Sequence, residues 1–181
     1  EDEIQKKDVT VFTMDDLANA PQRFAVWGGH STMLVVLEGK LILTDPILSE
    51  YCSPVQFAGP KRYTPPAIDK DVLKIVDLVL ISHNHYDHLD YNTVMLIGNH
   101  AQWIVPLGLK QWFREQGIYE VKEYDWWDDD LVEGVKITCL PSQHWSKRTV
   151  IKEFDTLWAS WAVEHKGFKF WFAGDTGYNS H

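Results

Sequence analysis

The hydrophobic residues of this chain fall into short runs that glycine, proline and charged residues interrupt. Two runs, Met33–Leu37 and Leu41–Thr44, flank the turn residues Gly39 and Lys40 and predict a β-hairpin. Similar runs predict further strands along the chain, at Val76–Ser82, Trp103–Val105, Val135–Leu140, Leu157–Val163 and Phe168–Phe172. Runs of this length, each bounded by turn residues, indicate a fold that is rich in sheet.

Three stretches carry the signals of short helices. One is the acidic stretch Asp15–Ala20, and the second is Tyr91–Ile97, with Asp90 before it as a candidate N-cap. The third is the amphipathic stretch Leu109–Gln116. Strands and helices alternate in the middle of the chain and strands follow at the end, which predicts a mixed α/β architecture with antiparallel hairpins at one edge. No repeat or low-complexity tract interrupts residues 1–181, so we expect one domain.

Composition and charge narrow the classes of protein to which this chain can belong. With 45% hydrophobic residues, 9 Trp, 8 Phe and 7 Tyr, the chain can bury a sizeable core. The formal net charge of -9 and the lack of a basic stripe argue against nucleic-acid binding. No apolar run is long enough to cross a membrane, so we expect any membrane contact to be peripheral. The two cysteines lie in no paired spacing, which favours a reducing, intracellular compartment.

Four side chains that bind metals lie within six residues, directly after the predicted strand Val76–Ser82. They are His83, His85, Asp87 and His88. Three imidazoles and one carboxylate suit zinc and, less decisively, iron or manganese, whereas calcium and magnesium prefer more oxygen ligands. In an extended segment His83 and His85 point the same way, so they can bind one ion while the following bend directs Asp87 and His88 to another. This loop therefore predicts a site for two ions.

Two later strands also end in residues that can bind a metal. His144 follows the strand Val135–Leu140, and Asp175 follows the strand Phe168–Phe172. His144 can complete a three-histidine set with the first two histidines of the ligand loop, and Asp175 can bridge that ion to the second one. A shared carboxylate is a reasonable way to hold two cations about 3.5–4 Å apart.

The sequence around these residues resembles a known family. His-x-His-x-Asp-His at 83–88, the distant His144 and Gly-Asp-Thr at 174–176 are similar to the motifs of the metallo-β-lactamase superfamily. Within it, the match is closer to the N-acyl-phosphatidylethanolamine-hydrolysing phospholipases D and their bacterial relatives. The segments that carry this closer resemblance are 27–32, 43–47, 53–63, 81–90, 105–109, 125–127, 143–148 and 172–178.

The resemblance implies an αβ/βα sandwich with two metal ions between the edges of its sheets. One ion would bind the three-histidine set, the other Asp87 and His88, and Asp175 would bind both. The family's last histidine comes from a C-terminal half that this chain does not reach, and His181 is not expected to replace it. The chain is therefore expected to be a C-terminally truncated domain with an incomplete second metal site. A complementing C-terminal segment or the second copy of a homodimer would complete it.

The activity that the resemblance implies is hydrolysis of N-acyl-phosphatidylethanolamine to N-acylethanolamine and phosphatidic acid, by a hydroxide between two zinc ions. Asp87 would act as metal ligand and proton acceptor, and Tyr86, Lys147, Arg148 and Gln56 would contact the phospholipid. The alternative interpretation of Tyr86 is an aromatic residue of the core, and that of Lys147 and Arg148 is a pair of solvated surface charges. Two further alternatives stay open: another hydrolase of this fold, such as a lactonase or a different phosphodiesterase, and an inactive fragment that binds at most one ion.

Overall fold

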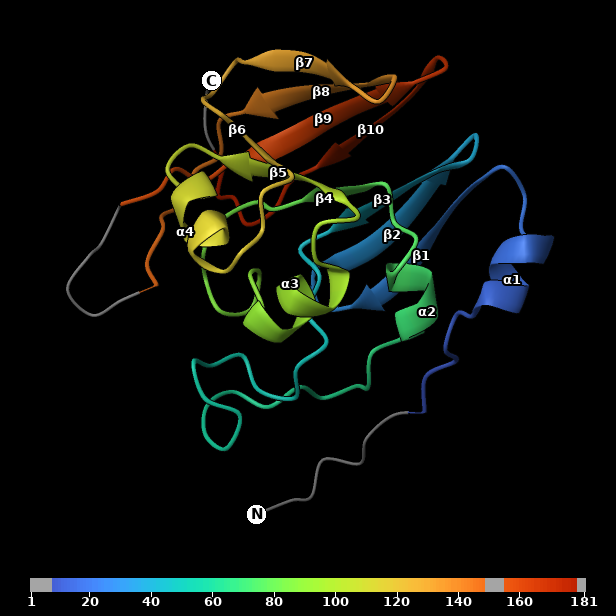
Figure 1. Cartoon of the computed structure of the whole chain (residues 1–181), viewed down its shortest axis with the longest axis horizontal. Helices are drawn as coiled ribbons and strands as arrows, with labels where there is room; N and C mark the ends of the chain where they lie inside the picture. The colour runs from blue at the N-terminus through green and yellow to red at the C-terminus, as the bar shows by residue number, and fades with distance from the viewer. Residues whose placement is uncertain (1–7, 149–154, 179–181) are drawn as a thin grey trace.

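Two β-sheets face each other, and helices cover the outer side of the first sheet (Figure 1). The computed structural model describes residues 8–148 and 155–178. Sheet packed on sheet, with helices outside, buries the apolar face of each element without a large helical bundle. The mixed α/β architecture expected from the sequence is confirmed.

The first sheet has six strands in the order β1-β2-β3-β4-β5-β6 and changes from antiparallel to parallel at β3. The predicted hairpin is its β2–β3 unit, and Glu38 and Gly39 at the turn both have positive φ angles, 49° and 87°. Short helices lie on the connections between the parallel strands. The bounds are β1 Arg23–Gly29, β2 Thr32–Leu37, β3 Lys40–Thr44, α2 Lys70–Leu73, β4 Leu78–Leu80, α3 Tyr91–Ile97, β5 Gln102–Pro106, α4 Lys110–Glu115 and β6 Val121–Tyr124; α1, Met14–Asn19, precedes them.

The second sheet has four antiparallel strands in the order β10-β9-β8-β7. Their bounds are β7 Asp129–Val132, β8 Val135–Leu140, β9 Ser160–His165 and β10 Phe168–Phe172. The inner strand β8 alternates buried and more exposed residues, as expected where one face of a sheet meets the core. In the region of the sandwich described here, β1 and β10 are the edge strands of the two sheets on the same side.

The core has two layers, one on each face of the first sheet. Val79 and Trp103 pack under the helices, against α4 residue Phe113. Their strand neighbours Leu78 and Ile104 pack instead against the second sheet. Because β4 and β5 are covered on both faces, their sequences are continuous apolar runs rather than alternating ones.

Several local details differ from the sequence-based expectation. Asp90 precedes α3 but makes no side-chain cap. Its carboxylate instead accepts hydrogen bonds from the Leu48 and Ser49 backbone N–H groups, at 3.3 and 3.1 Å, and from the Thr93 hydroxyl. The side chain thus connects the long segment between β3 and α2 to the start of α3. The β4 strand is shorter than the apolar run 76–82, because the chain leaves the sheet to form the ligand loop.

Candidate metal centre

The residues expected to bind metals come from segments far apart in the sequence and meet at the ends of strands. The ligand loop, residues 83–88, follows β4 of the first sheet, whereas His144 follows β8 and Asp175 follows β10 of the second. The two sheets are joined here, since Trp161 Nε1 donates to Ile81 O at 2.9 Å and Ala159 N donates to Ser82 O at 2.9 Å. The sandwich therefore places both sets of loops over one edge.

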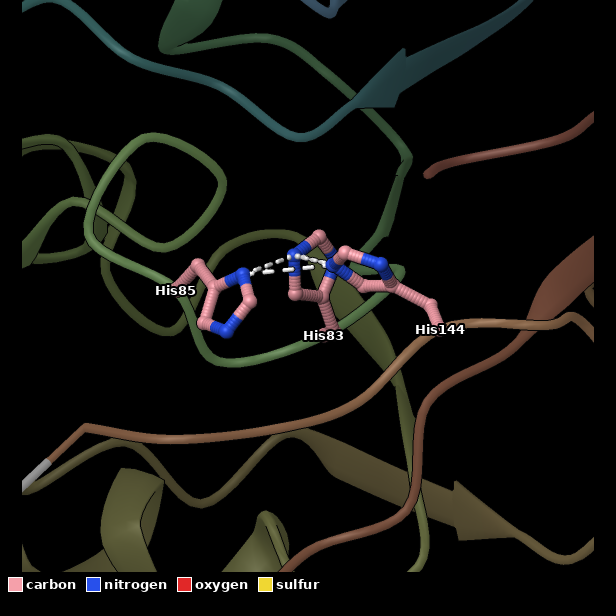
Figure 2. Close-up of side chains that lie close together, drawn as sticks. All are labelled: His83, His85 and His144. Carbon is pink, nitrogen blue, oxygen red and sulfur yellow. Dashed lines mark hydrogen bonds between the residues drawn. The ribbon is translucent and has the colours of Figure 1, made fainter. Parts of the chain in front are cut away.

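Three histidines point their ring nitrogens at one another (Figure 2). The distances are 2.8 Å between His83 Nε2 and His85 Nδ1, 3.2 Å between His144 Nε2 and His83 Nε2, and 3.3 Å between His144 Nε2 and His85 Nδ1. Three nitrogens that each lie about 2.0–2.1 Å from one tetrahedral zinc ion are separated by about 3.4 Å. The arrangement therefore brings three nitrogen donors within reach of one metal ion.

The electrostatics of this three-histidine cluster suit a cation. Burial, followed by the neighbouring imidazoles, lowers the pKa of His83 to about 2, and burial also lowers the pKa of His85 and of His144. The rings are consequently neutral at physiological pH and present lone pairs to the common point. Neutral imidazole is the form that binds transition metals.

A second cluster lies beside the first and contains carboxylates. His88 Nε2 lies 3.7 Å from Asp87 Oδ2 and 3.4 Å from Asp175 Oδ1, while Asp175 Oδ2 lies 3.7 Å from His144 Nε2. Asp175 thus faces both clusters, as expected of a bridging ligand. A hydrogen bond with His30 holds the pKa of Asp87 well below its usual range, and the nearby His88 ring lowers the pKa of Asp175 to about 2. Both carboxylates are ionised at neutral pH.

His88 carries the observation that tests this cluster for a metal. Its ring is fully buried, and Nε2 has no hydrogen-bond partner among the described residues although it faces Asp87 and Asp175. Burial lowers the pKa of His88, but the nearby carboxylate of Asp175 and the hydrogen bond with Asp45 raise it to about 10. A positive charge is therefore needed at Nε2, and a metal ion supplies it as well as a proton does. The residues present fit a two-metal centre.

Asp45 orients a histidine of each cluster from the Nδ1 side of the ring. This fully buried carboxylate follows β3 and accepts hydrogen bonds from His88 Nδ1 at 2.6 Å and from the Ser82 hydroxyl at 2.5 Å. The same hydroxyl lies 2.8 Å from His83 Nδ1. Because these contacts occupy the Nδ1 atoms, the Nε2 atoms of His83 and His88 face the metal positions. The close packing at this point requires Gly174, since a Cβ there would collide with Ser82.

Comparison with known families identifies the fold. A family model described as a β-lactamase superfamily domain matches residues 40–181. The chain belongs to the metallo-β-lactamase superfamily. The histidine and aspartate clusters described above lie within the matched part, apart from His30.

Two relatives of this metallo-β-lactamase superfamily chain bear the same functional name. This chain is 42% identical over 178 residues to N-acyl-phosphatidylethanolamine-hydrolyzing phospholipase D 1 of Caenorhabditis elegans. The match covers 92% of this chain and 50% of the worm protein. The chain is 35% identical over 162 residues to the mitochondrial N-acyl-phosphatidylethanolamine-hydrolyzing phospholipase D of Saccharomyces cerevisiae, covering 86% of this chain and 34% of the yeast protein. The chain therefore spans half or less of the length of these curated relatives.

Solved structures support the same fold. A metallo hydrolase from the archaeon Ignicoccus hospitalis superposes with a TM-score of 0.64 at 20% identity, covering 86% of this chain and 62% of that chain. A possible metal-dependent hydrolase from Veillonella parvula superposes with a TM-score of 0.68 at 18% identity, covering 88% and 65%. At these identities the likeness concerns the fold alone.

The residues expected to contact substrate have partners within the protein. The Tyr86 hydroxyl donates to Arg148 O at 2.8 Å, and the Arg148 guanidinium is itself hydrogen-bonded to backbone carbonyls. Gln56 bonds both ways to the Tyr51 backbone, and its side chain lines a cavity of about 140 Å³ together with Tyr86 and Arg148. Lys147 lies beside them and donates its backbone N–H to Asn84. Contact of these side chains with a substrate stays a prediction, and His181 lies outside the described residues.

Sequence reasoning missed two residues of the centre, Asp45 and His30. Both lie in segments that carry the family resemblance, 27–32 and 43–47, and Asp45 directly follows the predicted strand Leu41–Thr44. His30 Nε2 lies 3.1 Å from Asp87 Oδ2, and His30, Asp87 and His88 form a potential three-ligand group. His30 adopts a positive φ angle of 50° after Gly29, so it belongs to a tight turn that presents its ring to the second cluster.

Proposed function

We propose that this chain forms the metal-binding part of a phosphodiesterase that hydrolyses N-acyl-phosphatidylethanolamine to N-acylethanolamine and phosphatidic acid. The observation that carries the proposal is the convergence of four histidines and two aspartates into two adjoining clusters that share Asp175. The names of the worm and yeast relatives supply the substrate class. A single-domain organisation over residues 1–181 is part of the same proposal.

The two clusters differ in which residues would hold the metals. His83, His85 and His144 would hold one ion and Asp87 and His88 the other, with Asp175 shared. Zinc suits the nitrogen-rich first set. At the mixed second set, iron or manganese suits the ligands as well as zinc does. When bound, a metal pair supplies a hydroxide nucleophile near neutral pH and stabilises the charge that develops on the phosphate.

Asp87 contributes to this chemistry as an ionised carboxylate. The His30 hydrogen bond at 3.1 Å keeps it deprotonated and fixes Oδ2 toward His88. It can therefore bind an ion, whereas the low pKa makes it only a weak acceptor for the proton of an attacking water. The buried Asp45 keeps the two inner histidines in the tautomers that leave their Nε2 atoms free for metal.

A lipid substrate requires an apolar approach to the centre, and exposed aromatic residues lie around it. Trp145 packs against His85 with ring centroids 4.2 Å apart and remains 42% exposed, and Trp27 hydrogen-bonds to His30 O. Phe57, on the loop that also carries Gln56, is 82% exposed. Aromatic side chains of this kind favour the interface between water and a lipid surface.

Peripheral membrane association therefore forms part of the proposal, at an intracellular membrane. Within residues 8–148 and 155–178, no helix is both long and apolar enough to cross a bilayer. The yeast relative is mitochondrial by name. The negative charge of the chain disfavours nucleic acid as the phosphodiester substrate. We further propose that a C-terminal segment or a second copy of the chain in a homodimer supplies the remaining second-site ligand.

The decisive experiment offers the zinc-loaded protein two substrates in parallel, N-acyl-phosphatidylethanolamine in mixed micelles and a simple lactone. Mass spectrometry of the products should detect N-acylethanolamine and phosphatidic acid in equal amounts. Lactone opening without phospholipid cleavage would replace the proposed function with that of a lactonase. Cleavage of neither substrate by a chain that binds metal would favour the inactive-fragment alternative.

A further inference from the structure

Arg148 occupies an unusual position next to the three-histidine cluster. It lies four residues after His144, and its guanidinium is stacked between two aromatic rings. The guanidinium carbon lies 4.4 Å from the centroid of the Tyr86 ring and 4.9 Å from that of the Trp112 ring. Tyr86 belongs to the ligand loop and Trp112 to α4, so the side chain reaches from the second sheet's loop across to the first sheet's layer.

Hydrogen bonds connect the same segment to both ends of the ligand loop. Arg148 Nη1 donates to Asn84 O at 3.1 Å and to Leu89 O at 2.7 Å. In return the Tyr86 hydroxyl donates to Arg148 O at 2.8 Å, and Lys147 N donates to Asn84 Oδ1 at 2.8 Å. We call these contacts of residues 147 and 148 with the ligand loop, together with the Trp112 stacking, the Arg148 latch.

Removing the charge of Arg148 from water costs free energy, which argues that the latch has a role that offsets this cost. Burial lowers the pKa of Arg148 to about 10, so the group is still a cation at neutral pH. Among the ion pairs of the described residues, none involves Arg148, and its charge is stabilised by carbonyl oxygens, by ring faces and by the more distant carboxylate of Asp90. A largely buried charge that forms no ion pair is costly, and the directional contacts fix its position.

The position of the latch explains what it can do. His83 and His85 are carried by one sheet and His144 by the other, yet their nitrogens must stay within about 3.4 Å of one another to bind one ion. The latch bonds to Asn84, which lies between the first two histidines, and it begins three residues after the third. It therefore couples the two loops within a few residues of all three ring nitrogens.

We propose that Arg148 is a positioning residue, which holds the His144 loop against the ligand loop and thereby sets the geometry of the three-histidine metal site. The inference rests on the metal-dependent function proposed above, but it concerns the binding of the metal and not the choice of substrate. Arg148 acts through the backbone and does not touch the metal position itself.

The test compares two partly buried arginines that both donate to backbone carbonyls. Arg148→Met removes the latch donors and keeps an apolar stem. Arg62→Met is the matched control, because Arg62 binds Ile47 O and Ser49 O and so ties together a loop that carries no metal ligand. Zinc affinity of the first site is measured by competition with a chromophoric chelator. We expect roughly 10–100-fold weaker binding for Arg148→Met, the range typical of lost outer contacts of metal ligands, and less than a twofold change for Arg62→Met.

Conservative rescue and a spectrum separate positioning from general stability. Arg148→Lys keeps the cation between the rings and one donor, so its affinity should recover part of the loss. Cobalt(II) in the first site should show the absorption of a tetrahedral ion in the parent, a weakened band in Arg148→Met and an intermediate one in Arg148→Lys. A first-site affinity within twofold of the parent in Arg148→Met, or an equal loss in Arg62→Met, would overturn the proposal.

A second variant covers the case in which Arg148→Met does not fold. Asn84→Ala removes only the acceptor of the Lys147 N–H bond, and we expect about tenfold weaker zinc binding. Unchanged affinity in a folded Asn84→Ala chain would then overturn the latch. If the affinities follow the expected order while N-acyl-phosphatidylethanolamine is not cleaved, the latch stands and the proposed function fails.

Discussion

The three-histidine cluster and the carboxylate cluster lie side by side and share Asp175, yet they are built differently. The first consists of neutral imidazoles whose ring nitrogens lie 2.8–3.3 Å apart, two of them on residues with largely buried side chains. The second combines the buried His88 with side chains of Asp87, Asp175 and His30 that are 41%, 43% and 50% exposed. One site is preorganised by packing, whereas the other depends on carboxylates at the surface of the described fold.

This difference predicts an order of metal binding. A preorganised set of ligands loses little conformational entropy when it binds an ion, and exposed carboxylates must be ordered first. We therefore expect the three-histidine site to bind first and more tightly, and the carboxylate site to bind second. The following predictions test this comparison, from the largest expected effect to the smallest.

Removal of the metals should have the largest effect. Dialysis against a chelator should abolish hydrolysis completely, because no other nucleophile generator is present in the described centre. Zinc should restore the activity, with the second equivalent more easily removed than the first. Full activity of a chain shown by elemental analysis to be metal-free would refute metal-dependent catalysis.

His85→Ala should lower both first-site zinc affinity and hydrolysis by more than about 100-fold, because losing a ligand costs more than losing an outer contact. His100→Ala is the control, since His100 is an exposed histidine whose Nε2 lies 3.2 Å from Leu73 O, outside the centre. Zinc titration and initial rates measure the effect. Equal behaviour of the two variants would separate the three-histidine cluster from metal binding.

Asp45→Ala should affect both sites, because Asp45 orients His83 through Ser82 and His88 directly. We expect affinity for each ion to fall about 10–100-fold and the free energy of unfolding to fall by about 3–5 kcal/mol, since a fully buried pair loses one partner. Asp77→Asn, at a partly buried carboxylate bonded to Lys40, is the control and should leave metal affinity unchanged. Weakening of only one ion by Asp45→Ala would disprove the shared role.

His30→Ala should produce the smallest change and should distinguish the two sites. It removes the hydrogen bond to Asp87, so affinity for the second ion should fall about tenfold while the first-site affinity remains unchanged. His30→Gln, which keeps a donor, should recover part of the loss. Equal weakening of both ions in a calorimetric titration would show that the clusters are not as independent as their geometry indicates.

Much of the fold follows from the sequence because its central strands are apolar runs. β2, β3, β5, β8 and β10 were predicted within a few residues, and so were the positions of α1, α3 and α4. β6 and β7 were missed because short stretches such as Val121–Tyr124 and Asp129–Val132 carry charges that resemble turns. Pairing with a neighbouring strand makes these stretches strands, since Asp129 lies opposite Thr138 of β8 and Val121 lies opposite Trp103 of β5. β1 was missed because most of its residues are at least partly exposed and it ends in two glycines.

The candidate site was predictable where ligands are close in sequence and less so where the fold assembles them. The four metal-binding side chains within residues 83–88 predicted a metal site. His144 and Asp175, each after a predicted strand, were predicted as further ligands of that site. Asp45, His30 and the Arg148 latch could not be found this way, because each gains its role only from neighbours at least 36 residues away. A lone Asp, His or Arg carries no pattern that reveals such neighbours.

A zinc titration of the metal-free chain, followed by calorimetry and checked by elemental analysis, tests the central claim most directly. The account predicts two ions per chain that bind in separate steps, the first tighter, with His85→Ala removing the first step and His30→Ala weakening only the second. A single ion per chain, no binding, or two ions of equal affinity that respond alike to both variants would contradict it.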